Sequence, residues 1–468
     1  MDVIDYLKAH EHKDMLRFLT CGSVDDGKST LIGRMLYDAK MIFDDQLSAA
    51  ESESKKYGTT GEKIDMALLV DGLQSEREQG ITIDVAYRFF ATENRKFIIA
   101  DTPGHEQYTR NMVTGASTAD VAIILIDARK GILTQTRRHS FIVSLLRIEH
   151  IIVAINKMDL VDFSEERFEE IKAAYTILAE ELAIPHTYFI PLSALEGDNV
   201  VEPSDNTPWY QGKTLLTLLD TMVISHEPTL QEFRFPVQYV NRPNLDFRGF
   251  CGTIASGKVC VGDSITILPS GKTTTIKSII NAGDISESDR SKTTTEAYAP
   301  MSITLTTEDE IDISRGDMIV HTDFLPSVSN TLKVMLVWMG EAPMTLGRLY
   351  DIKRSTSVIS GSFETINYQV DVNTYERKKV EQLELNAIAS CKMVLTQPIA
   401  ADAYRSNRLS GSFIVIDRLT NTTVGAGMIK SVSRRETGTF SPKAYTQAEQ
   451  ELNAYIRKHF PEWDCKAI

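Results

Sequence analysis

The sequence predicts an α/β domain with a doubly wound, mostly parallel sheet, followed by two β-barrel domains. Three observations lead to this fold class. A glycine-rich loop, GSVDDGKS, stands at residues 22–29. Five apolar, strand-like runs in the first half each lead into a polar motif, and ligands bind at the carboxyl ends of parallel strands in such folds. From about Phe233 the long helical patterns give way to short β-rich runs separated by Gly turns, which is typical of small closed barrels.

The length and composition agree with several folded domains. A chain of 468 residues is expected to form about three domains, and 42% hydrophobic residues supply enough apolar side chains for their cores. The expected domains are an α/β domain over 1–228, barrels over 229–327 and 328–435, and a tail with a short helix over 436–468. The tail's stretch QAEQELNAYIRKHF carries apolar residues at helical spacing, so we expect this helix to pack on its own barrel.

Charge, cysteine usage and the N-terminus narrow the class of protein. The net charge of −14 argues against a protein that mainly grips a nucleic-acid backbone. Five cysteines without a C-x-x-C pair indicate reduced thiols, and His10 and His12 are interpreted as part of a solvated polar face. The acidic N-terminus does not resemble a signal peptide, and the apolar run 121–126 is too short to span a bilayer. The sequence therefore predicts a cytoplasmic protein without a membrane partner.

The loop at 22–29 matches G-x-x-x-x-G-K-[ST], the pattern of loops that cradle phosphates. Backbone N–H groups at a helix N-terminus hold such anions, and Lys28 is expected to reach the β- and γ-phosphates as a cation. The Ser29 hydroxyl is expected to bind a Mg²⁺ ion that bridges the same phosphates. The predicted nucleotide-binding residues of this loop are Gly22, Ser23, Val24, Asp25, Asp26, Gly27, Lys28, Ser29 and Thr30.

A mostly polar segment over 40–80 follows and leads into EREQGITID. Connections of this length are usually functional or mobile. In nucleotide triphosphatases a threonine in this region completes the Mg²⁺ shell and senses the γ-phosphate, so the loop is ordered with the triphosphate and released after hydrolysis. Thr82 is the predicted threonine. Arg77 is a candidate arginine finger only by its charge and its proximity in the sequence.

The motif DTPGH comes directly after the buried-strand run FIIA. Asp101, at the end of that strand, is expected to hold Mg²⁺ through a water molecule, which makes Ser29, Thr82 and Asp101 the predicted metal ligands. The Gly104 N–H is expected to donate to the γ-phosphate, and His105 is the predicted catalytic residue that orients the attacking water. The predicted nucleotide-binding residues of this motif are Asp101, Thr102, Pro103, Gly104 and His105.

Two further strand ends predict recognition of guanine. An aspartate offers two acceptors to the adjacent N1–H and N2 amino donors of guanine, whereas adenine would place an acceptor there. In NKMD this aspartate is Asp159, while Lys157 is expected to cover the ring and Asn156 to tie the motif to the phosphate loop. Backbone N–H groups of SAL are expected to contact O6 of the base. The predicted residues are Asn156, Lys157, Met158 and Asp159, with Ser193, Ala194 and Leu195.

The combination of GSVDDGKS, EREQGITID, DTPGHEQYTRNM and NKMD with two barrels is similar to the elongation-factor branch of GTPases. The strings NRPNLDFRGFCGTI and IDRLTNTTVGAGM further resemble the GTPase subunits of bacterial sulfate adenylyltransferase, and the likeness covers nearly the whole chain. The resemblance implies a P-loop GTPase domain, two barrels of elongation-factor type, GTP as substrate and Mg²⁺. It also implies a smaller ATP sulfurylase subunit as partner, which binds ATP and sulfate and makes adenosine 5′-phosphosulfate and pyrophosphate while GTP is hydrolysed.

Two other readings share the GTPase motifs. A translation factor that carries aminoacyl-tRNA has the same architecture, but the acidic balance and the lack of a basic, aromatic surface in the barrel sequences argue against it. Arg434 and Arg435 form the nearest approach to a basic cluster, and two arginines usually form a solvated edge. A GTP-dependent regulatory module without a metabolic partner is the third reading. Because of the acidic balance, no nucleic acid is expected as partner. The material that copurifies with the protein would distinguish the three readings.

Overall fold

The computed structural model describes residues 13–40, 54, 66–69, 82, 84–224, 232–244, 247–281, 293–432 and 447–459. The expectations for His10, His12, Arg77, Arg434 and Arg435 lie outside these residues. The chain forms two compact units, which we describe separately. The first comprises Met1–Ser225 with Val372–Thr374, and the second His226–Asp371 with Tyr375–Ile468.

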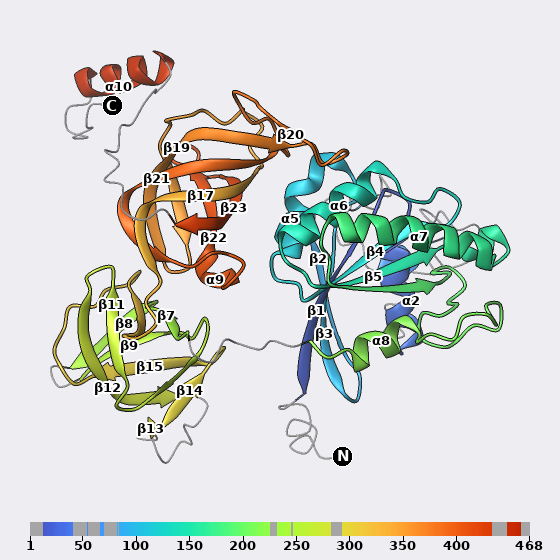
Figure 1. Cartoon of the computed structure of the whole chain (residues 1–468), viewed down its shortest axis with the longest axis horizontal. Helices are drawn as coiled ribbons and strands as arrows, with labels where there is room; N and C mark the ends of the chain where they lie inside the picture. Colours follow the sequence, from blue (N-terminus) through green and yellow to red (C-terminus); the bar gives the residue numbers. More distant parts are fainter. Residues whose placement is uncertain are drawn as a thin grey trace. The chain divides into compact units, whose positions relative to one another are not determined.

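The first unit is built on a six-stranded sheet with the order β2-β3-β1-β4-β5-β6 (Figure 1). The five predicted apolar runs all form strands, and these five pair in parallel. The sequence analysis missed β2 (Ala86–Ala91), which pairs antiparallel with β3 at one edge. The parallel strands are β1 (Asp14–Cys21), β3 (Arg95–Asp101), β4 (Val121–Asp127), β5 (His150–Asn156) and β6 (His186–Pro191).

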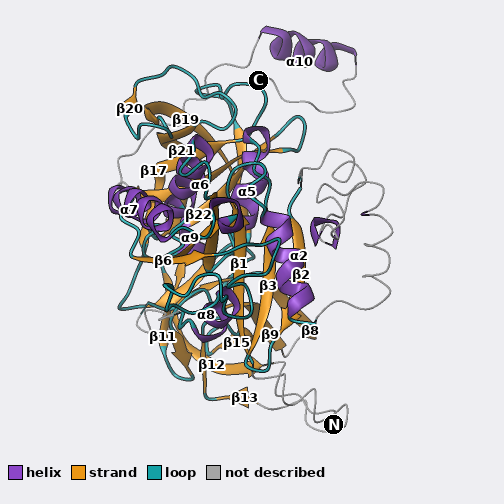
Figure 2. Cartoon of the chain, turned by 90° about the vertical axis from the view of Figure 1, so that its right-hand side faces the viewer, coloured by secondary structure: helices purple, strands orange, loops and turns teal. Residues whose placement is uncertain are grey.

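Helices cover both faces of this sheet, as a doubly wound fold requires (Figure 1). Leu31, Ile32 and Met35 of α2 pack with alternate residues of β4 on one face. Figure 2 shows the helices and strands of this unit in contrasting colours. The helices are α2 (Lys28–Asp38), α5 (Thr109–Ala116), α6 (Thr134–Leu145), α7 (Glu165–Glu181) and α8 (Leu215–Thr221), with short 3₁₀ turns η1 (Met66–Leu69), η2 (Glu106–Tyr108) and η3 (Met158–Val161).

The second unit contains two barrels. In the first, the strand path is β7-β16-β11-β12-β15-β9-β8, and an isolated bridge pairs Arg234 of β7 with Ser256, which follows β9. Phe233, Phe235 and Phe250 fill its interior. Its strands are β7 (Arg234–Pro236), β8 (Tyr239–Asn244), β9 (Phe247–Thr253), β10 (Lys258–Cys260), β11 (Ser264–Leu268), β12 (Lys272–Asn281), β13 (Thr293–Thr294), β14 (Glu296–Tyr298), β15 (Ser302–Thr307) and β16 (Met318–His321).

The second barrel follows the order β18-β22-β23-β17-β21-β19-β20 and closes through an additional pairing of β18 with β19. Alternate residues Leu332, Val334 and Leu336 of β17 point into its core. Its strands are β17 (Ser327–Trp338), β18 (Tyr350–Arg354), β19 (Ser357–Val370), β20 (Arg377–Lys378), β21 (Ile388–Ala401), β22 (Ser412–Asp417) and β23 (Thr423–Val432), with the short helix α9 (Arg408–Gly411) before β22. The predicted fold class, an α/β P-loop domain followed by two β-barrels, is therefore confirmed.

A buried ion pair joins the two barrels. Arg234 of β7 donates two hydrogen bonds to the carboxylate of Asp402, Nε to Oδ2 at 2.9 Å and Nη2 to Oδ1 at 3.1 Å. The Ser410 hydroxyl donates to Asp402 Oδ2 at 2.7 Å, so both carboxylate oxygens have donors. Arg234 and Asp402 are buried, and a small apolar cluster that includes Met318 and Ala400 spans the same two barrels.

We expect Asp402→Ala to lower the free energy of unfolding by up to about 3–5 kcal/mol, because it leaves the buried Arg234 guanidinium with the more distant, partly exposed Glu232 as its counter-charge, at 3.8 Å. Urea unfolding of the full chain measures this effect. Asp351→Ala is the matched control, because Asp351 pairs with Arg418 at 3.3 Å between half-exposed side chains and should cost no more than about 1 kcal/mol. Equal losses in the two variants would contradict the inter-barrel role.

The predicted C-terminal helix is present as α10 (Gln447–His459). Leu452 and Tyr455 on its apolar stripe are each 56% exposed, so the expected packing of these two side chains on the barrel is not observed. Among the described residues, the longest helices are too short or too polar to cross a membrane.

Candidate functional site

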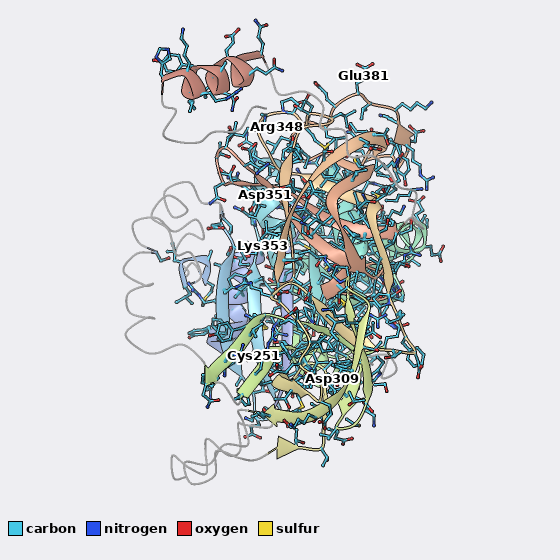
Figure 3. All side chains as sticks on the ribbon, turned by 90° about the vertical axis from the view of Figure 1, so that its left-hand side faces the viewer. Cys251, Asp309, Arg348, Asp351, Lys353 and Glu381 are labelled. Carbon is cyan, nitrogen blue, oxygen red and sulfur yellow. The ribbon has the colours of Figure 1, made fainter. Side chains whose placement is uncertain are left out.

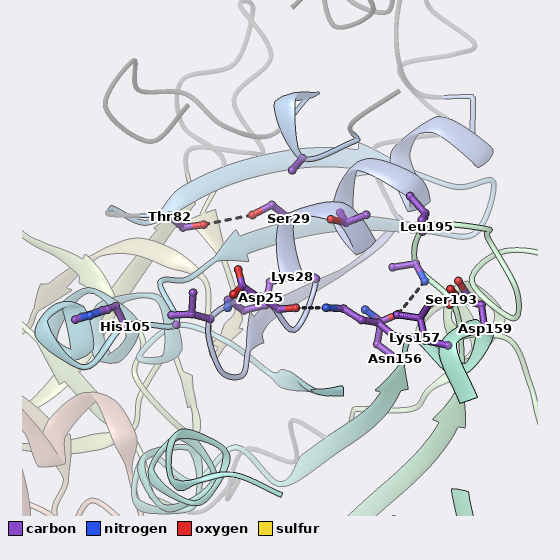
Figure 4. A pocket seen from close by; sticks show the side chains of 17 residues that line it. Asp25, Lys28, Ser29, Thr82, His105, Asn156, Lys157, Asp159, Ser193 and Leu195 are labelled. Carbon is purple, nitrogen blue, oxygen red and sulfur yellow. Dashed lines mark hydrogen bonds between the residues drawn. The ribbon is translucent and has the colours of Figure 1, made fainter. Parts of the chain in front are cut away.

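The predicted motifs meet at the carboxyl edge of the sheet, where they line a pocket of about 390 Å³ (Figure 4). The predicted residues in its wall are Val24, Asp25, Gly27, Lys28, Ser29, Thr30, Thr82, Gly104, His105, Asn156, Lys157, Asp159, Ser193, Ala194 and Leu195. The other predicted residues, Gly22, Ser23, Asp26, Asp101, Thr102, Pro103 and Met158, are buried in or beside the same loops. In Figure 4 His105 and Asp159 lie at opposite ends of the pocket, with Lys28 between them.

Two side chains accept hydrogen bonds from the backbone at the start of the phosphate loop. The Gly22 N–H donates to His139 Nδ1 at 3.0 Å, and the Ser23 N–H donates to Asp26 Oδ2 at 2.6 Å. Burial, and secondarily the charge of Lys28, lower the pKa of His139 to about 3, so its ring is neutral and Nδ1 can accept. Since these two N–H groups already have acceptors, they shape the loop rather than face a phosphate.

Lys28 is the lysine of the pocket wall that lies inside the phosphate loop. Its Nζ donates to the Ser23 carbonyl at 2.8 Å, inside the curve of the loop, and the side chain is buried. Burial lowers the pKa of Lys28, while the nearby charge of Asp101 opposes that shift. An anion bound in the loop would favour the charged form further, because it adds negative charge at the same amine.

Three oxygen ligands lie together beside Lys28. Ser29 Oγ donates to Asp101 Oδ2 at 2.7 Å and lies 3.3 Å from Thr82 Oγ1. The other carboxylate oxygen, Asp101 Oδ1, accepts from the buried Thr20 hydroxyl at 2.9 Å, which fixes the orientation of the carboxylate. Two hydroxyls and a carboxylate are hard oxygen ligands that suit Mg²⁺. The predicted metal ligands are thus brought together, and their chemistry fits the ion.

Gly104 and His105 close the phosphate end. A Cβ atom at Gly104 would lie 2.9 Å from both the backbone C of Ser23 and the backbone N of Val24, so only glycine fits against the loop here. His105 is exposed, and its Nδ1 accepts a hydrogen bond from the Gln107 N–H at 3.3 Å. With Nδ1 used as an acceptor, Nε2 is the ring nitrogen that carries a proton. A ring in this state can donate to a water or phosphate oxygen and so hold it in place.

We expect His105→Ala to slow GTP hydrolysis roughly 10²- to 10⁴-fold while the affinity for GTP stays nearly unchanged, because the ring lies beyond the groups that hold the phosphates. Single-turnover hydrolysis and nucleotide titration measure the two effects. His186→Ala is a matched control, since His186 is also exposed but begins β6 at the opposite edge of the sheet. Equal turnover in the His105 variant would show that another group positions the water.

At the other end of the pocket, Asn156 joins three motifs. Its Nδ2 donates to the Asp26 carbonyl at 2.7 Å, and its Oδ1 accepts from the Ala194 N–H at 2.9 Å. Asp159 Oδ1 is buried and has no hydrogen-bond partner among the described residues. A buried carboxylate oxygen without a donor is costly, and a bound base with adjacent N–H donors would satisfy it.

The side chain of Lys157 is held in place by residues outside the NKMD motif. Its Nζ donates to the Asp25 carbonyl of the phosphate loop and lies 3.2 Å from Asp127 Oδ2. Burial of Asp127 opposes its ionisation, but hydrogen bonds from Arg129 and the charge of Lys157 hold its pKa at about 2. Asp127 is therefore an anion that anchors Lys157 at the end of the pocket where the base is predicted to bind.

The backbone of Ser193–Leu195 was predicted to contact O6 of guanine as a group. The Ser193 N–H donates to the Asp198 carbonyl at 3.3 Å and the Ala194 N–H donates to Asn156, so both are already in use. The Leu195 N–H is the one of the three without an acceptor among the described residues. Of the three backbone N–H groups predicted to contact O6 of guanine, only that of Leu195 is therefore left to do so.

Sequence reasoning missed several residues of the site. Ala67 and Leu160 line the pocket. His139, Asp127 and Arg34 do not line it, but each contacts a residue of the predicted site, namely Gly22, Lys157 and Ala194 respectively. Ala67 lies in a segment that reads as a polar loop, and the supporting residues belong to no short motif. Asp127 could have been predicted from the sequence, because it stands at the carboxyl end of an apolar run, as the predicted site residues do.

Comparison with known proteins places these observations in a family. Residues 13–228 match the model of the elongation factor Tu GTP binding domain, and residues 331–430 match the GTP-eEF1A C-terminal domain-like model. The chain is 75% identical to sulfate adenylyltransferase subunit 1 of Sulfurovum sp. (strain NBC37-1), over 100% of this chain and 98% of that protein. It is 58% identical to the protein of the same name from Pseudoalteromonas atlantica, over 100% of this chain and 97% of that protein.

A solved structure described as sup35 complexed with GDP is also similar. It is 21% identical, covers 92% of this chain and 97% of its own, and has a TM-score of 0.41. A similarity at this level supports no conclusion about fold or function.

Proposed function

Because this chain belongs to the sulfate adenylyltransferase subunit 1 family, we propose that it is the GTP-hydrolysing subunit of a sulfate adenylyltransferase. GTP binds in the pocket of the α/β domain, and its hydrolysis drives formation of adenosine 5′-phosphosulfate and pyrophosphate from ATP and sulfate on a partner subunit. The observation that carries this proposal is the 75% identity over the whole chain to a protein of that name, combined with a nucleotide pocket whose base end has a buried, unpartnered carboxylate oxygen.

The predicted site residues take these roles in the proposal. The phosphate loop and Lys28 bind the β- and γ-phosphates, and the Leu195 N–H with Asp159 recognises the base. Ser29 and Thr82 would hold Mg²⁺, with Asp101 acting through water. The ion would neutralise and bridge the phosphate oxygens. His105, through its Nε2–H, orients the attacking water or a γ-phosphate oxygen.

The name "subunit 1" of the relatives implies a partner subunit. We propose that this partner is the smaller adenylyltransferase, which binds ATP and sulfate. The sequence supports this division of labour, because it contains one phosphate loop and no H-x-G-H or S-G-G-x-x-S motif for a second nucleotide. The cysteine pattern supports the cytoplasm as its location.

The charge distribution on the second barrel favours this partner over aminoacyl-tRNA. Figure 3 shows Arg348, Asp351 and Lys353 on this barrel, where acidic side chains stand beside basic ones. Arg348 pairs with Asp417 at 2.7 Å, and Lys392 pairs with Glu364 at 2.9 Å. Basic side chains that are neutralised in this way contribute little to binding a phosphate backbone.

Affinity purification from the native organism tests the proposed partner. We expect a smaller protein that binds ATP to copurify, and the ratio of the two to stay constant through gel filtration. Recovery of tRNA instead would support the translation-factor reading. Recovery of neither would leave a regulatory GTPase and would contradict the proposal.

A further inference from the structure

Arg34 holds the base-recognition loop from outside the pocket. It lies on α2, six residues or about one and two-thirds turns after the phosphate-binding Lys28. Its Nε donates to the Ala194 carbonyl at 3.4 Å, and its Nη2 donates to the Leu195 carbonyl. Its Nη1 donates to Asp38 Oδ1 at 3.2 Å, one helical turn away, which fixes the guanidinium on the helix surface. Arg34 itself is not among the residues that line the pocket.

The peptide between Ala194 and Leu195 carries this interaction into the pocket. A trans peptide is planar, so its C=O and N–H point in opposite directions. Since the Ala194 carbonyl points to Arg34, the Leu195 N–H points away from Arg34. Ala194 and Leu195 both line the pocket, and the other two N–H groups of the loop already have acceptors within the protein. The Leu195 N–H is therefore the donor that the loop presents to the base.

The rest of the loop is folded to keep this arrangement. The Glu196 N–H, which belongs to the peptide of the second Arg34-bound carbonyl, donates to Ser193 Oγ at 3.2 Å. Gly197 has φ +96°, and a Cβ there would lie 3.1 Å from Asp38 Oδ2 and 3.5 Å from Arg34 Cδ. The loop therefore turns directly against the Arg34–Asp38 pair, and glycine allows that approach.

We propose that Arg34 is a positioning residue that determines recognition of the 6-keto oxygen of the base, because it orients the Leu195 N–H toward that oxygen. The inference deepens the proposed function and rests on GTP being the nucleotide bound. Arg34 touches neither the phosphates nor the groups that face the N1–H and N2 amino group of guanine. Its removal should therefore weaken one part of base recognition and leave the other intact.

Two analogues separate these parts in equilibrium titrations of the full chain. In 6-thio-GTP a sulfur, which is a weaker and larger acceptor, replaces O6, while both donors to Asp159 remain. ITP keeps O6 and lacks the N2 amino group. We expect Arg34→Ala to bind GTP and GDP roughly tenfold more weakly, to lose the wild-type preference for GTP over 6-thio-GTP, and to keep the preference for GTP over ITP. Arg34→Lys should lie between, because an ammonium can hold one carbonyl but not fork to two.

Arg95→Ala is the matched control. Arg95 also binds two backbone carbonyls and one carboxylate, those of Leu219, Met222 and Asp14, but it lies at the amino end of β3, whereas the pocket lies at the carboxyl ends of the strands. This variant should lose stability and keep both analogue preferences. If the Arg34→Ala variant does not fold, Arg34→Lys tests the inference instead. Its preference for GTP over 6-thio-GTP should then be weaker than that of the wild type, while its preference for GTP over ITP is kept.

Three results would overturn the inference. In the first, the Arg34 variants keep the wild-type preference for GTP over 6-thio-GTP. In the second, they lose the preferences over 6-thio-GTP and over ITP to the same extent. In the third, the wild type binds 6-thio-GTP as tightly as GTP. A wild type that shows no preference for GTP over ITP or ATP would instead contradict the proposed function, and it is recognised before any variant is made.

Discussion

Lys28→Ala is expected to lower the affinity for GTP roughly 100- to 1000-fold. Lys28 Nζ is buried inside the phosphate loop, 2.8 Å from the Ser23 carbonyl, and is the cation that we propose to bind the phosphates. Removing it leaves the negative charge of a triphosphate facing the Asp26 and Asp101 carboxylates with less compensation. Truncating one member of a buried charge pair typically costs this much in binding. Titration with a fluorescent GTP analogue measures the change.

Lys172→Ala is the matched control for Lys28. Lys172 is an exposed lysine of α7 that pairs with Glu169 at 2.8 Å, so its loss should leave nucleotide affinity within about twofold. A Lys28 variant that binds GTP as tightly as this control would show that the triphosphate is held elsewhere.

The second large effect is expected from Asp159→Asn, which should shift the preference from guanine to xanthine nucleotides. Asp159 Oδ1 is a buried acceptor with no partner among the described residues. An amide in its place would turn one acceptor into a donor facing the N2 amino group of guanine, whereas xanthine carries an oxygen at that position. Sites that depend on such hydrogen bonds reject the mismatched base strongly, so GTP affinity should fall roughly 100-fold or more.

Competition between GTP and XTP in the same titration gives the preference directly. Asp162→Asn is the control, because Asp162 is exposed, lies three residues away and has φ 52°, a conformation that asparagine tolerates. A variant at Asp159 that still prefers GTP would contradict the assignment of the base site.

The fold and most of the pocket followed from local sequence patterns. The parallel strands are apolar runs, of which β4 and β5 are buried on both faces. Each motif stands at a strand's carboxyl end, so adjacency in the sheet brings the motifs together. The strand β2 was missed because its side chains alternate with exposed Tyr87 and Phe89 at a sheet edge, which gives no buried run. The domain boundaries at 228, 327 and 435 stay predictions.

The supporting residues were missed for a different reason. His139 meets the phosphate loop across 117 positions of sequence and Arg34 meets the base loop across more than 150, and neither lies in a short pattern. The use of the Ser193 and Ala194 N–H groups within the protein was also invisible, because hydrogen-bond partners of a loop depend on tertiary packing. Motifs identify the groups that touch a ligand, whereas the groups that orient them emerge only from the fold.

Pyrophosphate release by the copurified complex tests the central claim most directly. The reaction contains ATP and sulfate, with GTP present, with GTP absent, or with a non-hydrolysable GTP analogue. We expect GTP to raise product formation beyond the level reached with ATP and sulfate alone, and the analogue to fail to sustain that level. Product formation that is the same in all three reactions would contradict the account, because GTP hydrolysis would then contribute nothing to sulfate activation.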